Sequence, residues 1–507
     1  MAVSKGIISA FSALVIALIG LFTVNVGSAS AAMTFHSGFE SGSTFEWSSS
    51  WGTFSIQTSI KKTGTYAMRC NPSTSPVYVN AGATANRGTF YLYIAAAPSI
   101  ETIICGRTST SSIQLTATNY ITLYDGSAIR GTSTTQLALS TWYRISFSRD
   151  SSNNGAAYIN GTQEISTTTL VNGFSERLGV VSTGAATADL YFDDVAFDNT
   201  QSIDDVGDIR TLLSLPNAAG NYTQFDTTFP ASPTTHYTKV DDPPLSSFDA
   251  DYNQHAANSG NAYDTYNIQD ALTIGIGAND TVNAVRYCGR MRRGYGGRTT
   301  HNLAVRDNGS DYTTPVSATT SFAWYSRYDA TMPTGGGQAW TQARLNSFEV
   351  GVYHGSGAQD TYISACMVMV AYTPEANISI LPPPPNNSYD FGLVDESSIT
   401  DTALTYFTVT NNSADAVNIS ISGTDMSGGV TWALSDTATQ GDDTYGLKAG
   451  LEGGDYTIIV KKTSPNFLVT GLATSASQRW GLQLLAPTYF SDGETKSATV
   501  TLTATYA

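Results

Sequence analysis

The pattern of apolar and polar positions changes sharply near the N-terminus. An apolar run over residues 6–26 follows Lys5 and closes on Ala29-Ser30-Ala31. A basic end, an apolar middle and small residues before the cleavage point are typical of a secretory signal peptide. We therefore expect residues 1–31 to be a leader and the mature chain to be extracellular. An uncleaved membrane anchor is the alternative, because the run has nearly the length of a bilayer span.

After the leader, short runs with period-two alternation predict strands. In residues 142–147, for example, Tyr143, Ile145 and Phe147 alternate with polar residues, and turn dipeptides such as Asn160-Gly161 separate such runs. Runs with helical period are lacking between them. The sequence therefore predicts an all-β protein, built as three tandem β-sandwiches after the secretory leader.

The strand-rich regions cover residues 33–199, 205–375 and 387–507. The linker over residues 376–386 contains four consecutive prolines, which favour a semi-rigid polyproline II spacer. In the second region Thr341 is a suitable N-cap, so we expect a short helical turn after it.

The first region carries Gly38-Phe39-Glu40, Lys62-Thr-Gly-Thr-Tyr-Ala67 and Phe192-Asp193-Asp194-Val195 in this order. Together these motifs resemble the concanavalin-like or laminin-G-like jelly roll, which is also similar to many carbohydrate-binding modules. Relatives of this kind often hold a structural calcium between their first and last strands. The resemblance therefore implies Glu40 and Asp194, with Asp193 as a second choice, as part of a calcium shell of about six to eight oxygens. Solvated turn carboxylates are the alternative.

Two further resemblances concern the other regions. The second region has Tyr263-Asp-Thr-Tyr266 and Gln338-Ala-Trp-Thr341, and it is similar to a recurrent β-sandwich domain of tailed-phage structural proteins. The third region resembles the immunoglobulin-like modules of bacterial surface proteins. The phage likeness makes a virion structural or host-recognition protein, located on a virion surface, an alternative to a secreted or cell-surface protein.

The charge of the chain limits its partners. Charged residues make up only 13% of the sequence, and the formal net charge is −16. This acidic excess argues against nucleic acid, and we expect membrane contact only if the leader is uncleaved. The basic cluster around Arg290 alternates with apolar residues, as in a strand with one wet face. The cluster consists of Arg286, Arg290, Arg292, Arg293 and Arg298.

The four cysteines fall in pairs within two regions. Cys70 and Cys105 lie in the first region, and Cys288 and Cys366 lie in the second. In an oxidising compartment the expected disulfides are 70–105 and 288–366. Buried free thiols are the alternative.

Motifs for catalysis are lacking. The histidines have no metal-ligand spacing, so we expect them in loops or on the surface. Glu164 and Glu176 stand alone, and we interpret them as surface charges rather than as the carboxylate pair of a glycosidase. We therefore expect no enzymatic activity; a polysaccharide hydrolase is the alternative.

Aromatic side chains provide the candidate binding residues. Trp47, Trp51 and Tyr124 in the first region could stack on sugar rings. The sequence thus predicts a non-enzymatic extracellular protein for surface binding or display, with a glycan or cell-surface polysaccharide as the favoured ligand. Self-association through unpaired strand edges stays open.

Overall fold

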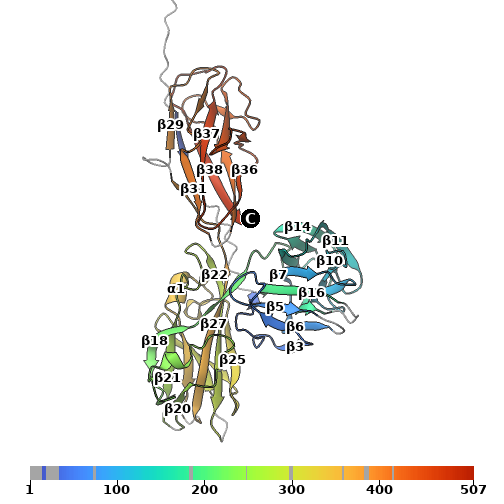
Figure 1. Cartoon of the computed structure of the whole chain (residues 1–507), viewed down its shortest axis with the longest axis vertical. Coiled ribbons are helices and arrows are strands. Elements are labelled where there is room, and N and C mark those ends of the chain that lie inside the picture. Colours follow the sequence, from blue (N-terminus) through green and yellow to red (C-terminus); the bar gives the residue numbers. More distant parts are fainter. Residues whose placement is uncertain are drawn as a thin grey trace, which may run out of the picture. The chain divides into compact units, whose positions relative to one another are not determined.

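The computed structural model describes residues 14–18, 33–71, 76–181, 187–246, 248–257, 259–295, 301–356, 359–381, 388–413 and 416–506. Strands and turns dominate these ranges, which confirms the all-β prediction (Figure 1). The helical segments found there are η1 (His236–Lys239), η2 (Pro333–Gly335) and α1 (Gln342–Asn346).

The helical turn expected after Thr341 is present as α1. The Thr341 hydroxyl accepts a hydrogen bond from the amide of Arg344 and so caps the first turn. Within the described ranges, every helix is too short and too polar to cross a membrane.

The chain divides into two compact units. One unit covers residues 26–374, and the other combines residues 375–507 with residues 1–25. Two β-sandwiches share the first unit, whereas the sequence predicted them as separate domains.

The first sandwich packs two sheets on one core. Phe90 and Phe192 of one sheet and Ile104 of the other are fully buried in this core. One sheet contains, in spatial order, β14 (Thr162–Thr167), β13 (Gly155–Ile159), β12 (Trp142–Arg149), β7 (Arg87–Ala96), β16 (Asp189–Asp198), β5 (Ala67–Cys70) and β4 (Ser55–Gln57), with β2 (Met33–Ser37) beside β16. The other contains β11 (Ile129–Gln136), β10 (Tyr120–Tyr124), β9 (Ser112–Leu115), β8 (Thr102–Gly106), β15 (Phe174–Val180), β6 (Val77–Ala85) and β3 (Ser49–Trp51).

The second sandwich is built around two long neighbouring strands. One sheet contains, in spatial order, β19 (Thr227–Phe229), β20 (Tyr252–His255), β27 (Thr361–Thr373), β22 (Thr281–Arg293) and β25 (Ala323–Asp329), with β17 (Arg210–Ser214) also on β27. The other contains β18 (Pro216–Thr223), β21 (Ala262–Ile268), β26 (Glu349–His354), β23 (His301–Asp307) and β24 (Ser310–Val316). Strand β27 is buried along almost its whole length, as its continuous apolar sequence predicts.

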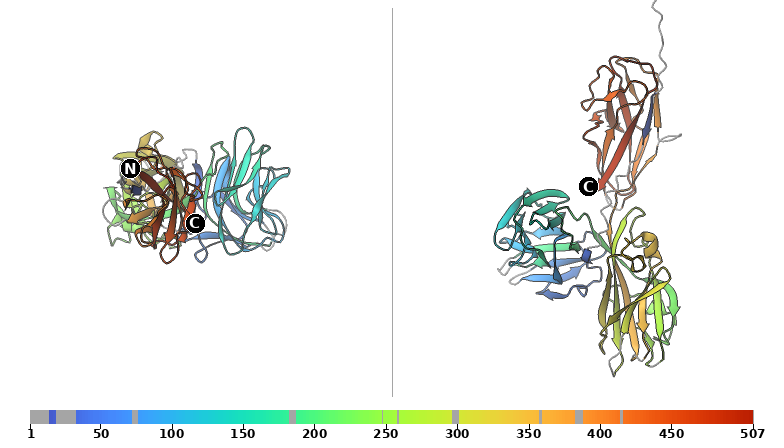
Figure 2. Two further views of the ribbon diagram at one scale, coloured as in Figure 1. Left: turned by 90° about the horizontal axis from the view of Figure 1, so that it is seen from above. Right: turned by 180° about the vertical axis from the view of Figure 1, so that it is seen from behind.

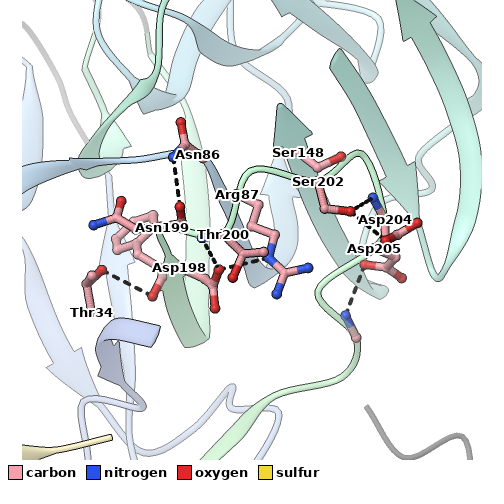
Figure 3. A network of polar contacts seen from close by, with 12 residues as sticks. Thr34, Asn86, Arg87, Ser148, Asp198, Asn199, Thr200, Ser202, Asp204 and Asp205 are labelled. Carbon is pink, nitrogen blue, oxygen red and sulfur yellow. Dashed lines mark hydrogen bonds and ion pairs between the residues drawn. The ribbon is translucent and has the colours of Figure 1, made fainter. Parts of the chain in front are cut away.

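The connector between the first two sandwiches is bonded to the first sandwich. Asp198 accepts hydrogen bonds from Arg87 Nε (2.9 Å) and from the amide of Thr200 (2.6 Å) (Figure 3). Further along, the hydroxyl of Ser148 donates to the carbonyl of Ile203 (2.9 Å). These bonds fix the path of the chain from β16 to β17.

An apolar junction completes the contact between these sandwiches. Met33 and Ala196 of the first pack against Ala284 and Ala371 of the second. The Tyr328 hydroxyl donates to the Met33 carbonyl at 3.0 Å. These apolar contacts and the hydrogen bond join the two sandwiches within one unit.

The third sandwich belongs to the other unit. One sheet contains, in spatial order, β29 (Ser388–Gly392), β1 (Leu14–Leu18), β38 (Ser497–Tyr506), β32 (Val417–Gly423) and β36 (Asn466–Leu472). The other contains β28 (Ile378–Leu381), β31 (Phe407–Asn411), β37 (Ser477–Leu485), β34 (Thr444–Leu451) and β33 (Ala433–Leu434), with β30 (Ile399–Asp401) on β37 and β35 (Ile458–Ile459) on β34.

Two segments of the third sandwich differ from the sequence expectations. Residues 378–381 of the predicted linker form β28, which pairs with β31, so this part of the linker belongs to the sandwich. Residues 382–386, with the prolines, lie outside the described residues. The predicted leader also lies outside them, except for Leu14–Leu18, which forms β1.

The two units should unfold in separate transitions. Trp480 is fully buried in the third sandwich and stacks on Phe407, with ring centroids 4.7 Å apart. We expect Trp480→Ala to destabilise residues 375–507 by about 3–5 kcal/mol, because the ring leaves a cavity. Calorimetry should show one transition moved and the other unchanged. The control Phe467→Ala, an exposed ring of the same sandwich, should change stability by less than about 0.5 kcal/mol. An equal shift of both transitions would contradict the division.

Candidate functional site

Strand β22 carries a row of arginines on one face. Arg286, Arg290 and Arg292 alternate with Tyr287 and Met291, which pack in the core between the two sheets. A strand turns successive side chains to opposite faces, so the arginines share the outer face. The alternation predicted from the sequence is therefore present.

The first sandwich covers one end of this row. Arg286 is 6% exposed, and its guanidinium lies 4.8 Å from the ring centroid of Phe35 and 5.1 Å from that of Tyr328. Within the described part of the chain Arg286 forms no ion pair, and the buried carboxyl groups of Glu46 and Glu176 face its charge. The sequence predicted that this face of the strand is exposed to solvent, but at Arg286 it is buried.

Aromatic rings surround the other end of the row. The Arg292 guanidinium lies 3.4 Å from the ring centroid of Tyr362, 5.0 Å from that of Phe322 and 5.7 Å from that of Tyr252. Phe229 stacks on Tyr252, with centroids 5.0 Å apart and planes at 15°. We call Phe229, Tyr252, Arg292, Phe322 and Tyr362 the aromatic–arginine face.

Strand register assembles this face from distant segments. Phe229 of β19 is paired with Tyr252 of β20, and Arg292 of β22 is paired with Tyr362 of β27. Phe322 lies just before β25, the neighbour of β22 on its other side. The sequence alone does not indicate that these rings form one face, because only the pairing of the strands brings them together.

The aromatic–arginine face offers both apolar and polar groups to solvent. Phe229 is 50% exposed, and Arg292 forms no ion pair among the described residues. By contrast, the guanidinium of Arg290 donates to both oxygens of Asp249, at 2.7 and 2.8 Å. The Tyr362 hydroxyl donates to Asp360 at 3.0 Å. Rings that lie beside charged donors and acceptors can stack on a ligand and hydrogen-bond its hydroxyl groups.

The aromatic residues expected from the sequence do not form a common platform. Trp47 is 5% exposed and stacks on Phe39 in the first core, so it presents no ring to a ligand. Trp51 is 59% exposed on β3, and Tyr124 is half-buried on β10. Four strands lie between β3 and β10 in this sheet, namely β6, β15, β8 and β9, so these two rings lie towards opposite edges of it.

The carboxylates expected to bind calcium are buried beside one another. Glu40 accepts hydrogen bonds from the amides of Thr65 and Tyr66. A Cβ on Gly64, whose φ is +61°, would overlap the Glu40 carboxylate, so glycine is required there. These contacts place Glu40 against the Lys62–Ala67 motif.

Asp193 and Asp194 sit at an irregularity of β16. The register with β7 shifts after Asp193, and Asp194 adopts a left-handed φ of 47°. Asp193 accepts hydrogen bonds from the amides of Lys62 and Thr63, and Asp194 Oδ1 accepts from the amide of Thr211 (2.8 Å). Asp194 Oδ2 is buried and accepts no hydrogen bond from the residues that the structure describes.

This arrangement does not fit calcium as it stands. Among the described residues no group of three or more His, Cys, Asp or Glu side chains is placed to hold a metal. Backbone amides already donate to the oxygens of Glu40 and Asp193, and of the oxygens of this cluster Asp194 Oδ2 accepts no hydrogen bond within the described ranges. Calcium would need about six to eight oxygens.

Burial and mutual repulsion hold protons on this cluster instead. Burial raises the pKa of Glu40 to about 8, and the neighbouring charge of Asp194 adds to the rise. Burial also raises the pKa of Asp194 to about 7 and that of Asp193 well above its usual range. The folded state therefore binds protons near neutral pH that the unfolded chain releases.

The carboxylate cluster should make stability fall as pH rises. In the folded chain Glu40 keeps its proton up to about pH 8, whereas in the unfolded chain the same carboxyl group ionises near pH 4.5. The free energy of unfolding therefore decreases as the pH rises from 4.5 to 8. We expect wild-type protein to lose about 2–4 kcal/mol relative to Glu40→Gln over this range, measured by chemical unfolding. The exposed Glu494→Gln is the control and should show no such trend.

A second measurement tests calcium binding directly, by comparing melting temperatures with and without added calcium. Millimolar calcium should leave the melting temperature of wild-type protein unchanged at pH 8. A calcium-dependent rise that Glu40→Gln abolishes would show that the carboxylates exchange their amides for a cation.

All four cysteines are free, buried thiols. Cys288 packs with Met367 and Met369 on the outer face of its sheet, whereas Cys366 lies in the core and contacts the Tyr287 hydroxyl. The expected 288–366 disulfide is therefore wrong, since the two side chains are on opposite faces. Cys70 and Cys105, which we also expected to pair, lie as free thiols in the first core. Burial raises the pKa of Cys70 to about 12, so this thiol is unreactive at neutral pH.

Three histidines meet at one end of the second sandwich. The rings of His255 and His354 lie 4.6 Å apart. Nδ1 of His301 and Nδ1 of His354 lie 2.7 and 2.9 Å from the Thr361 hydroxyl. His255, His301, His354 and also His36 are buried, so their expected position in loops or on the surface is wrong. The sequence did not predict this cluster because strand pairing, which places His301 opposite His354, brings the histidines together.

His354 should make stability fall at acidic pH. Burial, together with the charges of His255 and His301, lowers its pKa to about 4. The unfolded chain therefore binds a proton between about pH 6.5 and 4 that the folded chain refuses, and stability declines over that window. We expect wild-type protein to lose stability relative to His354→Gln as pH falls, measured by denaturant unfolding.

The matched control is His236→Gln, which should show the opposite sign. The hydrogen bond with Asp264 raises the pKa of His236, so that interaction stabilises the folded state at low pH and is lost as pH rises. Equal pH profiles for wild type and His354→Gln would contradict a neutral, buried His354.

The glutamates considered for a hydrolase lie in different sheets. Glu164 is on β14 and accepts hydrogen bonds from Thr134 and Thr135, which lower its pKa to about 2. Glu176 is on β15 and accepts a hydrogen bond from Thr34. The surface position expected for Glu176 is wrong, because it is 2% exposed.

Comparisons with known proteins give only distant likenesses. No family model matches the chain, and no curated protein matches it by sequence. The receptor-binding domain of botulinum neurotoxin D is 11% identical with a TM-score of 0.28, covering 62% of this chain and 100% of that domain. The cellulose-induced protein Cip1 is 12% identical with a TM-score of 0.27, covering 33% of this chain and 99% of Cip1.

A mutant of Trypanosoma rangeli sialidase displaying trans-sialidase activity is also similar. It is 12% identical with a TM-score of 0.24, covering 34% of this chain. The match spans only 31% of the sialidase chain.

Proposed function

We propose that this protein is an extracellular, non-enzymatic glycan-binding protein and that the aromatic–arginine face contacts the sugar. The observation that supports this most is the half-exposed Phe229, stacked on Tyr252 beside an arginine without a carboxylate partner. A sugar ring has an apolar face that stacks on aromatic rings and hydroxyl groups that need hydrogen-bond partners. The aromatic–arginine face supplies both.

The charge of the face favours a particular class of glycan. Arg292 is held by three rings and has no carboxylate to neutralise it among the described residues. A guanidinium in this state can bind the carboxylate of an acidic sugar with charge-assisted hydrogen bonds. We therefore expect uronic-acid-containing polysaccharides to bind better than neutral ones.

Absence of catalysis is part of the same proposal. A glycosidase needs two carboxyl groups across one sugar, and Glu164 and Glu176 lie on strands of different sheets. The aspartates at the margin of the aromatic–arginine face are already bonded, Asp249 to Arg290 and Asp360 to Tyr362. Binding without turnover is what these contacts favour.

Glycan binding should depend on Phe229. Purified full-length protein should bind acidic glycans on an array, and Phe229→Ala should weaken binding about tenfold, as loss of roughly 1.5 kcal/mol of stacking predicts. Titration calorimetry with the best array ligand measures the change. Added salt should weaken binding of the wild type, because a charge contact contributes.

Two exposed rings elsewhere serve as matched controls. Tyr489→Ala, in the third sandwich and 54% exposed, should bind as the wild type does. Trp51→Ala tests the first sandwich, and loss of binding in that variant alone would place the site there. Wild-type protein that binds no glycan at all would refute the proposed function.

A further inference from the structure

The third sandwich contains one strand that the C-terminal region does not supply. Strand β1 lies between β29 and β38, and it appears as the blue strand among the orange and red ones (Figures 1 and 2). It runs antiparallel to β29 and parallel to β38. Its register pairs Ile16 with Tyr389 on one side and with Ala498 on the other.

Without β1 the sheet would have a gap of one strand. Within the described residues, β29 pairs with no strand other than β1, and the edge of β38 over residues 497–500 pairs with β1 alone on that side. Adjacent strands lie about 4.8 Å apart, so the gap has the width of one extended chain. We call this gap the strand slot.

Apolar side chains flank the strand slot on both sides. Phe391 of β29 is 6% exposed, and Tyr389 packs at right angles to Tyr406, with centroids 4.6 Å apart. On β38, Ala498 and Val500 face the same core. These contacts hold β29 to the sandwich by its side chains, while its backbone groups still require a strand partner.

We propose that the strand slot is an acceptor for one extended apolar strand and that its occupant is Leu14–Leu18. The segment reads Leu-Val-Ile-Ala-Leu, which is apolar at every position and includes the β-branched Val15 and Ile16. Backbone hydrogen bonds to both neighbours supply the affinity, as in other cases where an added strand completes a sheet. This inference does not depend on the proposed glycan binding.

In the full chain the segment completes the third sandwich. A chain cleaved after Ala31 keeps the strand slot but lacks its strand, so the slot is open to an added strand of the same chemistry. Such an open edge is what proteins otherwise cover or block.

The test compares the full chain with a chain that begins at Ala32. Hydrogen exchange should be at least tenfold faster for the amides of residues 388–392 and 497–500 in the shorter chain. A synthetic peptide of residues 12–20, flanked by lysines for solubility, should bind the shorter chain and restore protection there. The full chain should not bind this peptide.

The matched control peptide carries Ile16→Pro, which removes a backbone donor and blocks strand pairing. It should neither bind nor protect. A dimer of the Ala32 chain that the natural peptide dissociates would also support the acceptor, with a second copy as its occupant. Equal protection in both chains without peptide, or equal effects of both peptides, would overturn the proposal.

A second pair of variants covers the case in which the shorter chain does not fold. In the full chain, Ile16→Pro should speed exchange of residues 388–392 at least tenfold, whereas Ile16→Val should leave it unchanged. The same exchange rate in both variants would overturn the proposal.

Discussion

The two-residue period of β22 is the constraint from which the core, the junction and the candidate site of the first unit all follow. One face of this strand places Tyr287 and Met291 in the core. The other face places Arg286 in the junction and Arg292 among the rings of Tyr252, Phe322 and Tyr362. A slip of one residue against β27 would drive the arginines into the core, so the register is strongly determined.

The junction explains why only one end of the arginine row is open. Phe35 of the first sandwich covers Arg286, and Phe45 stacks on Trp324, the strand partner of Arg290. A buried guanidinium without an ion pair is costly unless other groups stabilise it, and here the Phe35 and Tyr328 rings do so. Around Arg292, the rings in contact among the described residues are Tyr252, Phe322 and Tyr362, which all belong to the second sandwich.

Local sequence patterns predicted what depends on local structure. The sequence predicted the strand alternation, the all-β class and the helix after Thr341, because each depends on residues that are close in sequence. Features that depend on the pairing of strands far apart in the chain could not be predicted from the sequence. Phe229, Tyr252 and Tyr362 meet only through their partners in the sheet. The histidine cluster also depends on strand pairing. The spacing of Cys288 and Cys366 in the sequence does not show that their side chains lie on opposite faces of the sheet. Trp47 was misplaced because a tryptophan near a turn can lie in the core or on the surface with the same local sequence.

A crystal structure of the full chain with the strongest array ligand tests the central claim most directly. The account predicts a sugar ring stacked on Phe229 at about van der Waals distance, with an acidic group next to the Arg292 guanidinium. Density for the ligand beside Trp51, or anywhere away from the outer face of β22, would contradict it.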